Sequence, residues 1–176
     1  VGSILVQLAK QLTDITVIGT ASRPESQSWV KSLGADAVID HHQPLDQALK
    51  AAGFDGVDMV ISLNQSDHHF DAIIEALKPQ GKLALIDDPE LIDVRKLKVK
   101  SLSLHWELMF TRPLFTTDDL AKQHDLLTEV AAMVDDGRLT TTLGEVLGPI
   151  NAENLKRAHA LIESNRTIGK LVLEGF

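Results

Sequence analysis

Two short stretches carry residue types suited to binding phosphate groups. Gly2 and Ser3 stand at the start of an apolar helical pattern that extends to Leu12. A glycine lets the backbone approach a phosphate, and the unpaired N–H groups of a helix start attract anions. The stretch from Thr20 to Arg23 offers two hydroxyls and a guanidinium without a carboxylate. Each also has a structural explanation, because Gly2 stands at a chain end and Ser22 fits a helix cap.

Alternating strands and helices are expected to position these stretches. Apolar, β-branched runs predict buried strands, and capped periodic segments between them predict helices. The expected strands are residues 15–20, 37–40, 57–63 and 82–86, and the expected helices are residues 24–33, 44–52 and 66–77. Such alternation is typical of right-handed β-α-β units on a parallel sheet. We therefore predict an α/β fold with a doubly wound, Rossmann parallel sheet.

The pattern changes after residue 90. "SLSLHWELMF" predicts a long apolar strand at residues 101–110, and a helix is expected from Thr117 to Asp136. Its inward face would be Leu120, Leu127, Val130 and Val134. A small strand at 139–143, extending at most to 147, a helix capped by Asn151 and a last strand at 169–176 follow.

Composition narrows the possible partners and compartments. The 176 residues include 17 basic and 25 acidic side chains, a net charge of −8 without a long basic run. Nucleic acid and anionic membrane are therefore not expected as partners. No stretch reaches the roughly 18 apolar residues of a membrane span, and there is no cysteine. We expect a cytoplasmic protein without disulfides or thiolate metal sites.

The order of elements suggests that both phosphate-binding stretches belong to one nucleotide site. A doubly wound nucleotide-binding sheet begins with a strand, a glycine-rich turn and a helix. This chain starts at that helix, so we expect the first strand and the earlier glycines to be missing. The end of the second strand then faces the adenosine ribose, where a carboxylate favours NAD and hydroxyl or basic groups favour NADP. Ser22 and Arg23 follow the NADP pattern.

Other candidate sites are weaker. The pairs His41–His42 and His68–His69 look like metal ligands, but adjacent side chains point in different directions and no third ligand is suitably spaced. We interpret them as surface histidines. Asp87 and Asp88 after a strand fit a solvated approach to a helix, and the Trp106 and Met109 stripe fits core or subunit contact. No G-x-S-x-G motif of a hydrolase occurs.

Several segments together resemble the medium-chain dehydrogenase/reductase superfamily, in particular the zinc-type alcohol dehydrogenase and quinone oxidoreductase group. "VGSILVQLAK" resembles the end of that family's "GGxGGVGS" turn and its helix. "VIGTASRPE", "LGADAVIDH", "VDMVISL" and "LKPQGKLALID" resemble the following strand ends in the same order. "AHALIESNRTIGKLVLEGF" resembles the closing helix and strand, so the resemblance covers the whole chain.

The resemblance implies a set of cofactor contacts. Gly2 would border the pyrophosphate, Ser22 and Arg23 would meet the 2′-phosphate, and His41 would lie beside the adenosine. Leu63 and Asn64 after one strand, and Ile86 and Asp87 after the next, would approach the ribose and nicotinamide. Lys170 in "TIGK" is a looser candidate for a cofactor contact. The implied cofactor is NADP(H), and no zinc is expected in this chain.

The resemblance also implies an organisation and an activity. Residues 1–136 would be a dinucleotide-binding domain truncated at its N-terminus, and residues 137–176 would return to a missing GroES-like catalytic domain. The parent enzyme would transfer hydride between NADPH and a small carbonyl, quinone or alcohol, and this chain alone would be inactive. A homodimer would form through the edge strand at 101–110, unless the 117–136 helix covers it. A non-catalytic nucleotide-sensing or scaffold domain, and a methyl-transfer domain using S-adenosylmethionine, remain alternatives.

Overall fold

The first half of the chain forms a small parallel α/β unit. The computed structural model describes residues 1–175, and Phe176, the end of the last predicted strand, lies outside the described residues. Strands β1 and β2 pair in parallel, with Ile18 opposite Ala37. The elements in order are α1 (Gly2–Leu12), β1 (Ile18–Thr20), α2 (Pro24–Ser32), β2 (Ala37–Ile39) and α3 (Leu45–Ala51).

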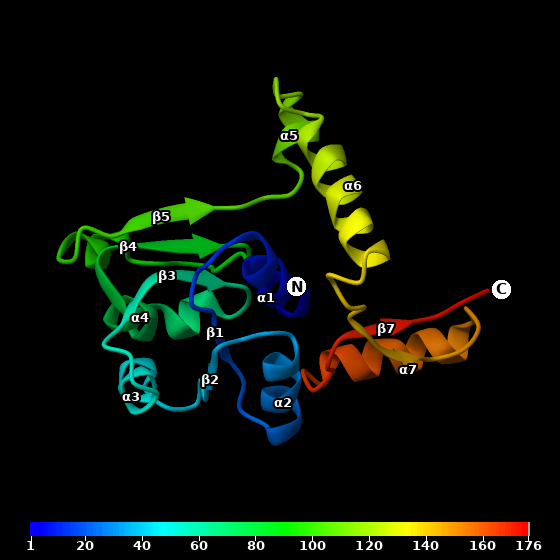
Figure 1. Cartoon of the computed structure of the whole chain (residues 1–176), viewed down its shortest axis with the longest axis horizontal. Helices are drawn as coiled ribbons and strands as arrows, with labels where there is room; N and C mark the ends of the chain where they lie inside the picture. Colours follow the sequence, from blue (N-terminus) through cyan, green and yellow to red (C-terminus); the bar gives the residue numbers. More distant parts are fainter. Residues whose placement is uncertain (176) are drawn as a thin grey trace.

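A second parallel sheet follows, in the order β3-β4-β5 (Figure 1). Its strands are connected by helical crossovers, as parallel pairing requires. The elements are β3 (Val57–Ser62), α4 (Ser66–Ala76), β4 (Leu77–Leu85), the 3-10 helix η1 (Val94–Lys98) and β5 (Ser103–Trp106). Strand β4 lies in the middle, and its Leu83 and Leu85 side chains are fully buried.

The two sheets share one hydrophobic core although no hydrogen-bonded strand joins them. Ile39 of β2 belongs to the same buried cluster as Leu83 of β4 and Phe70 of α4. Within residues 1–175, β1 pairs only with β2 and β3 pairs only with β4. The predicted α/β fold with parallel sheets is therefore confirmed, and the sheet has a gap between β1 and β3. An unpaired edge on each of these strands is the expected consequence of such a gap.

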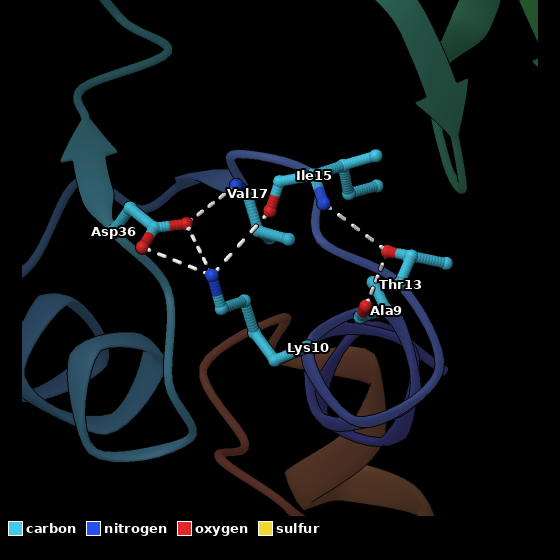
Figure 2. A network of polar contacts seen from close by, with 6 residues as sticks. All are labelled: Ala9, Lys10, Thr13, Ile15, Val17 and Asp36. Carbon is cyan, nitrogen blue, oxygen red and sulfur yellow. Dashed lines mark hydrogen bonds and ion pairs between the residues drawn. The ribbon is translucent and has the colours of Figure 1, made fainter.

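A polar network fixes α1 against the β1-β2 sheet (Figure 2). The Lys10 ammonium donates to both carboxylate oxygens of Asp36, at 3.0 and 2.9 Å. The same carboxylate accepts the backbone N–H of Val17 at 2.7 Å. The backbone hydrogen bond from Val17, followed by that from Lys10, holds the pKa of Asp36 below its ordinary value. Asp36 therefore connects the end of α1 to the start of both strands.

The C-terminal third is built from three helices and one two-stranded parallel sheet. Strand β6 pairs with β7, and the Asn151 side chain accepts the N–H of Asn154 at 2.8 Å, which confirms the predicted cap. The elements are α5 (Thr111–Phe115), α6 (Lys122–Asp135), β6 (Leu143–Val146), α7 (Ala152–Glu163) and β7 (Lys170–Val172). The observed strand β6 thus begins at Leu143, the last residue of the strand expected at 139–143, and lies within its possible extension to residue 147.

The predicted inward face of the 117–136 helix is wrong. Helix α6 starts at Lys122, and α5 precedes it where no helix was expected. Leu120, Leu127 and Val134 are exposed, Val130 is half-buried, and Met133 is the fully buried residue of α6. Figure 1 shows α5 and α6 extending away from β5, so α6 does not cover that edge strand. The Trp106 and Met109 side chains are accordingly exposed and are not core.

A buried side chain joins the N-terminal helix to the C-terminal third. The Gln7 carbonyl oxygen accepts the backbone N–H and the hydroxyl of Thr140, at 2.8 and 3.0 Å. Its amide nitrogen donates to the Thr140 carbonyl at 3.1 Å.

The domain division at residue 136 stays a prediction. Among residues 1–175, no helix has both the length and the apolarity needed to cross a membrane.

Candidate functional site

The ends of β1 and β2 open into a pocket of about 600 Å³. Most of its lining comes from the residues after β1, from α2, from the turn after β2 and from the loop at 165–169, and Ser3 of α1 and Gln65 complete it. None of its described lining residues is Asp or Glu. The polar side chains that line it are Ser3, Thr20, Ser22, Arg23, Ser26, Trp29, His41, His42, Gln65, Asn165, Arg166 and Thr167. The pocket therefore brings together Ser22, Arg23 and His41, as the sequence predicted.

Ser22 does not cap α2, contrary to one expectation from the sequence. Helix α2 has Arg23 at its N-cap, and Ser26 provides the local hydrogen bonds. The Ser26 hydroxyl accepts the N–H of Arg23 at 3.3 Å and donates to its carbonyl at 2.9 Å. Because Ser26 fulfils that role, the half-buried Ser22 hydroxyl stays available to the pocket.

Arg166 is a pocket residue that the sequence reasoning missed. The Arg23 guanidinium donates one N–H to the Arg166 carbonyl at 2.8 Å, which holds the two residues side by side. Arg166 lies in the loop "NRTIGK", four residues before the predicted Lys170. A basic residue so close to a predicted contact was the available signal. Which side of the pocket it would reach depended on how residues 165–169 fold back, which the local sequence does not reveal.

The two histidine pairs lie together beside the pocket. The ring centroids are 4.7 Å apart in His41–His42, 4.8 Å in His68–His69, and 6.1 Å between His41 and His69. His41 and His69 are half-buried, which corrects the interpretation of all four as surface histidines. Burial, followed by the charge of neighbouring histidines, lowers the pKa of both. Their neutral forms are thereby favoured at neutral pH, so the two arginines dominate the positive charge here.

A second group of predicted residues surrounds the start of α1. A Cβ placed on Gly2 would lie 3.4 Å from Leu63 Cδ1, so Leu63 packs on the glycine backbone. Lys170, the first residue of β7, directly follows the pocket residue Gly169. The Trp29 indole donates to the Ser3 hydroxyl at 2.9 Å. Since Ser3 also lines the pocket, the two groups are adjacent.

The residues after β3 and β4 divide into exposed and bound ones. Asn64 and Ile86 are exposed, as a ligand contact requires. Both oxygens of Asp87 instead accept hydrogen bonds from Ser66, one from its N–H and one from its hydroxyl. Burial raises the pKa of Asp87, but these hydrogen bonds outweigh it and the pKa lies below its ordinary value. Asp87 is therefore not a solvated approach to a helix.

The chemistry of the pocket suits a phosphate. Two guanidiniums and several hydroxyls are donors, and phosphate oxygens are acceptors. The helix start at Gly2 adds backbone N–H groups nearby. Among residues 1–175, no three His, Asp or Glu side chains are arranged to hold a metal ion together.

Comparison with known proteins gives the chain a family context. A zinc-binding dehydrogenase family model matches residues 33–173. A zinc-type alcohol dehydrogenase-like protein of Staphylococcus aureus (strain MSSA476) is 36% identical over 174 residues. That match covers 98% of this chain and 52% of the relative.

Solved structures match over the same extent. A Rhizobium etli CFN 42 protein classed as a zinc-dependent alcohol dehydrogenase is 54% identical, with a TM-score of 0.94 over 99% of this chain and 51% of the other. Mycobacterial Rv1454c, solved in complex with NADPH, is 27% identical, with a TM-score of 0.76 over 98% of this chain and 52% of the other. The chain thus spans about half the length of the relatives it matches.

Proposed function

Since the chain belongs to the medium-chain dehydrogenase/reductase family, whose nucleotide-binding half it covers, we propose that it binds NADP(H). The whole protein would be an oxidoreductase that transfers hydride between NADPH and a small carbonyl, quinone or alcohol. The observation that carries the proposal is the carboxylate-free pocket containing Ser22, Arg23 and Arg166. The NADPH complex of one relative adds support.

The 2′-phosphate is the group that best fits the arginines. A phosphate near neutral pH carries up to two negative charges, and charge-assisted hydrogen bonds to guanidinium are about twice as strong as neutral ones. Arg23 uses one N–H on the Arg166 carbonyl and retains others. Ser22 and Thr20 supply hydroxyl donors on the same side. NADH, which lacks this phosphate, would leave these donors to water.

The chain's own residues would bind and orient the cofactor. The start of α1 at Gly2 would face the pyrophosphate, and the half-buried His41 would lie beside the adenosine. Leu63, Asn64 and Ile86 would shield the other end from water, and Lys170 would contact the cofactor from the start of β7. The hydride chemistry is supplied by the nicotinamide when it is bound. Within this chain we assign no catalytic acid or base.

We propose no zinc ligand among residues 1–175. The four histidines nearest the pocket do not present three ligands to one point. We therefore derive no step through a metal ion. The family model that matches residues 33–173 is called zinc-binding dehydrogenase, and this name alone assigns no zinc ligand to these residues.

We further propose that the whole protein forms a homodimer through β5. Within residues 1–175 this strand pairs with β4 on one side only, and its last residue, Trp106, has an exposed side chain. Unpaired, apolar strand edges tend to pair with another chain. The cytoplasmic location expected from the sequence stays a prediction.

Replacing Arg23 with alanine in the full-length protein tests the cofactor proposal. The loss of a charge-assisted phosphate contact should weaken NADPH binding by about 1.5–3 kcal/mol, on the order of tenfold to 150-fold. NADH binding should be nearly unchanged. Nucleotide fluorescence titration measures both affinities.

Arg157→Ala is the matched control, because Arg157 of α7 pairs with Glu145 of β6 and does not line the pocket. It should change neither affinity. An equal loss of NADPH and NADH affinity in Arg23→Ala would refute the phosphate role. Failure of the unchanged protein to bind either nucleotide would favour a scaffold function.

A further inference from the structure

A hydroxyl–carboxylate chain connects the ends of two neighbouring strands. Ser62, the last residue of β3, and Ser66, the first residue of α4, have their hydroxyl oxygens 2.6 Å apart. The Ser66 hydroxyl donates its single hydrogen to Asp87, which lies just past β4. Ser62 must therefore donate to Ser66. The Ser66 N–H donates to the other Asp87 oxygen at 2.9 Å.

This chain, which we call the Ser62–Ser66–Asp87 clamp, encloses the loop at residues 63–65. Ser62 and Ser66 flank the loop directly, and both are buried, Ser66 completely. Leu63 of that loop packs on Gly2, and Gln65 lines the pocket. Gln65 also has a left-handed backbone, with φ at 54°. A non-glycine residue holds such a conformation only where the surroundings impose it.

We propose that Asp87 is a positioning residue that acts through Ser66 and Ser62 to fix the 63–65 loop for cofactor binding. This inference rests on the proposed function and changes the expected role of Asp87 from a cofactor contact to a support. Each oxygen of the Asp87 carboxylate accepts a hydrogen bond from Ser66, the residue that directly follows the loop. Asp87 therefore holds the end of the loop. Buried, fully bonded networks of this kind fix one conformation because each member would be costly to leave unpaired.

The clamp should matter most for the part of the cofactor beyond the adenosine. Leu63 of the loop packs on Gly2 at the helix start, whereas Arg23 is held to Arg166 by a hydrogen bond that does not involve the loop. A displaced loop would therefore disturb the pyrophosphate, ribose and nicotinamide more than the 2′-phosphate. A ligand that contains only the adenosine end, 2′,5′-ADP, separates these two effects.

The test is Asp87→Asn in the full-length protein, titrated with NADPH and with 2′,5′-ADP. Asparagine replaces one of the two acceptor oxygens with an NH2 donor, so the two hydrogen bonds that Ser66 donates to separate oxygens cannot both be kept in this arrangement. We expect NADPH affinity to fall about fivefold to twentyfold and 2′,5′-ADP affinity to change by less than about twofold. Ser66→Ala, which removes the hydroxyl and keeps the N–H, should give the same split if Asp87→Asn folds poorly.

Asp93→Asn is the matched control. Asp93 also accepts a backbone N–H at a helix start, that of Arg95 in η1, but does not line the pocket. It should leave both affinities unchanged. Equal loss of both ligands in Asp87→Asn and Ser66→Ala, or no loss of either, would overturn the inference. If the unchanged protein binds neither ligand, the proposed function fails and this inference fails with it.

Discussion

Leu83 and Leu85 in β4 are fully buried, whereas Leu114 and Phe115 in α5 are 68% and 75% exposed. The first pair belongs to the β3-β4-β5 sheet, where α4 and the β1-β2 sheet close a core around it. The second pair belongs to the α5–α6 arm, residues 107–136, which extends away from that sheet (Figure 1). Both regions are rich in apolar residues. The sheet region buries many of them within residues 1–175, whereas in the arm Met133 is buried and most of the other large apolar side chains are exposed.

The contrast separates two uses of apolar side chains. In the sheet they provide the folding free energy, since burial contributes about 25 cal/mol per Å² of apolar surface. In the arm, a large exposed apolar surface indicates an interaction site for another molecule or for another part of the whole protein.

The proposed cofactor pocket lies where Arg23 of the N-terminal half meets Arg166 of the C-terminal third. Its formation depends on both parts keeping their relative position.

The largest expected effect is a difference in stability between matched leucine substitutions. Leu83→Ala should lower the free energy of unfolding by about 3–4 kcal/mol, because it opens a cavity in a closed core. Leu127→Ala in α6 should cost under about 1 kcal/mol, because that side chain is mostly exposed. Urea unfolding followed by circular dichroism measures both. Similar losses at the two sites would remove the contrast.

Self-association should respond to the edge strand next to the arm. Trp106→Glu places a charge on the exposed end of β5 and should raise the dimer dissociation constant about tenfold or more. Sedimentation velocity over a concentration series measures it. Ile162→Glu, an equally exposed position on α7, serves as the control and should have no effect. A monomeric unchanged protein would contradict the proposed homodimer.

Gln7 tests the connection between the two parts. Gln7→Ala leaves the Thr140 N–H and carbonyl without their partner, so we expect a loss of about 1–2 kcal/mol. Limited proteolysis should also become faster between residues 136 and 142, because that segment loses its attachment. A stable variant with unchanged proteolysis would show that the two parts are held together elsewhere.

The smallest effect is expected at the exposed Lys10–Asp36 network. Asp36→Asn should lower the melting temperature by no more than about 3 °C at neutral pH, since solvent screens such pairs. The folded-state pKa of Asp36 is depressed, so its contribution is present above the unfolded-state pKa and is lost as pH falls through the folded-state value. The difference from the unchanged protein should therefore shrink as the pH falls below the ordinary Asp pKa of about 4. A difference that grows on acidification would contradict this assignment.

Much of the sheet region could be predicted because its local signals agree with its tertiary environment. The apolar runs at 37–40 and 57–63 correspond to β2 and β3, and Asn151 caps α7 as expected. The arm could not be predicted in the same way. Helical periodicity identifies a potential apolar face, but which face is covered depends on neighbours that sequence pattern does not specify.

The candidate site also contains residues that could be predicted from the sequence and residues that could not. Ser22, Arg23 and His41 follow strand ends, so topology alone predicts that they meet. Arg166 reaches the pocket through a loop remote in sequence, and Asp87 is bound by a serine 21 residues away. Such long-range partners follow from the packing of α4, β4 and the C-terminal loop. No local motif encodes them.

The ratio of NADH to NADPH dissociation constants in the unchanged full-length protein tests the central claim most directly. The account predicts that NADPH binds at least about tenfold more tightly, because the 2′-phosphate gains charge-assisted bonds to Arg23 and its neighbours. It also predicts that 2′,5′-ADP competes with NADPH. Equal affinities, or tighter binding of NADH, would contradict the assignment of this pocket to the 2′-phosphate.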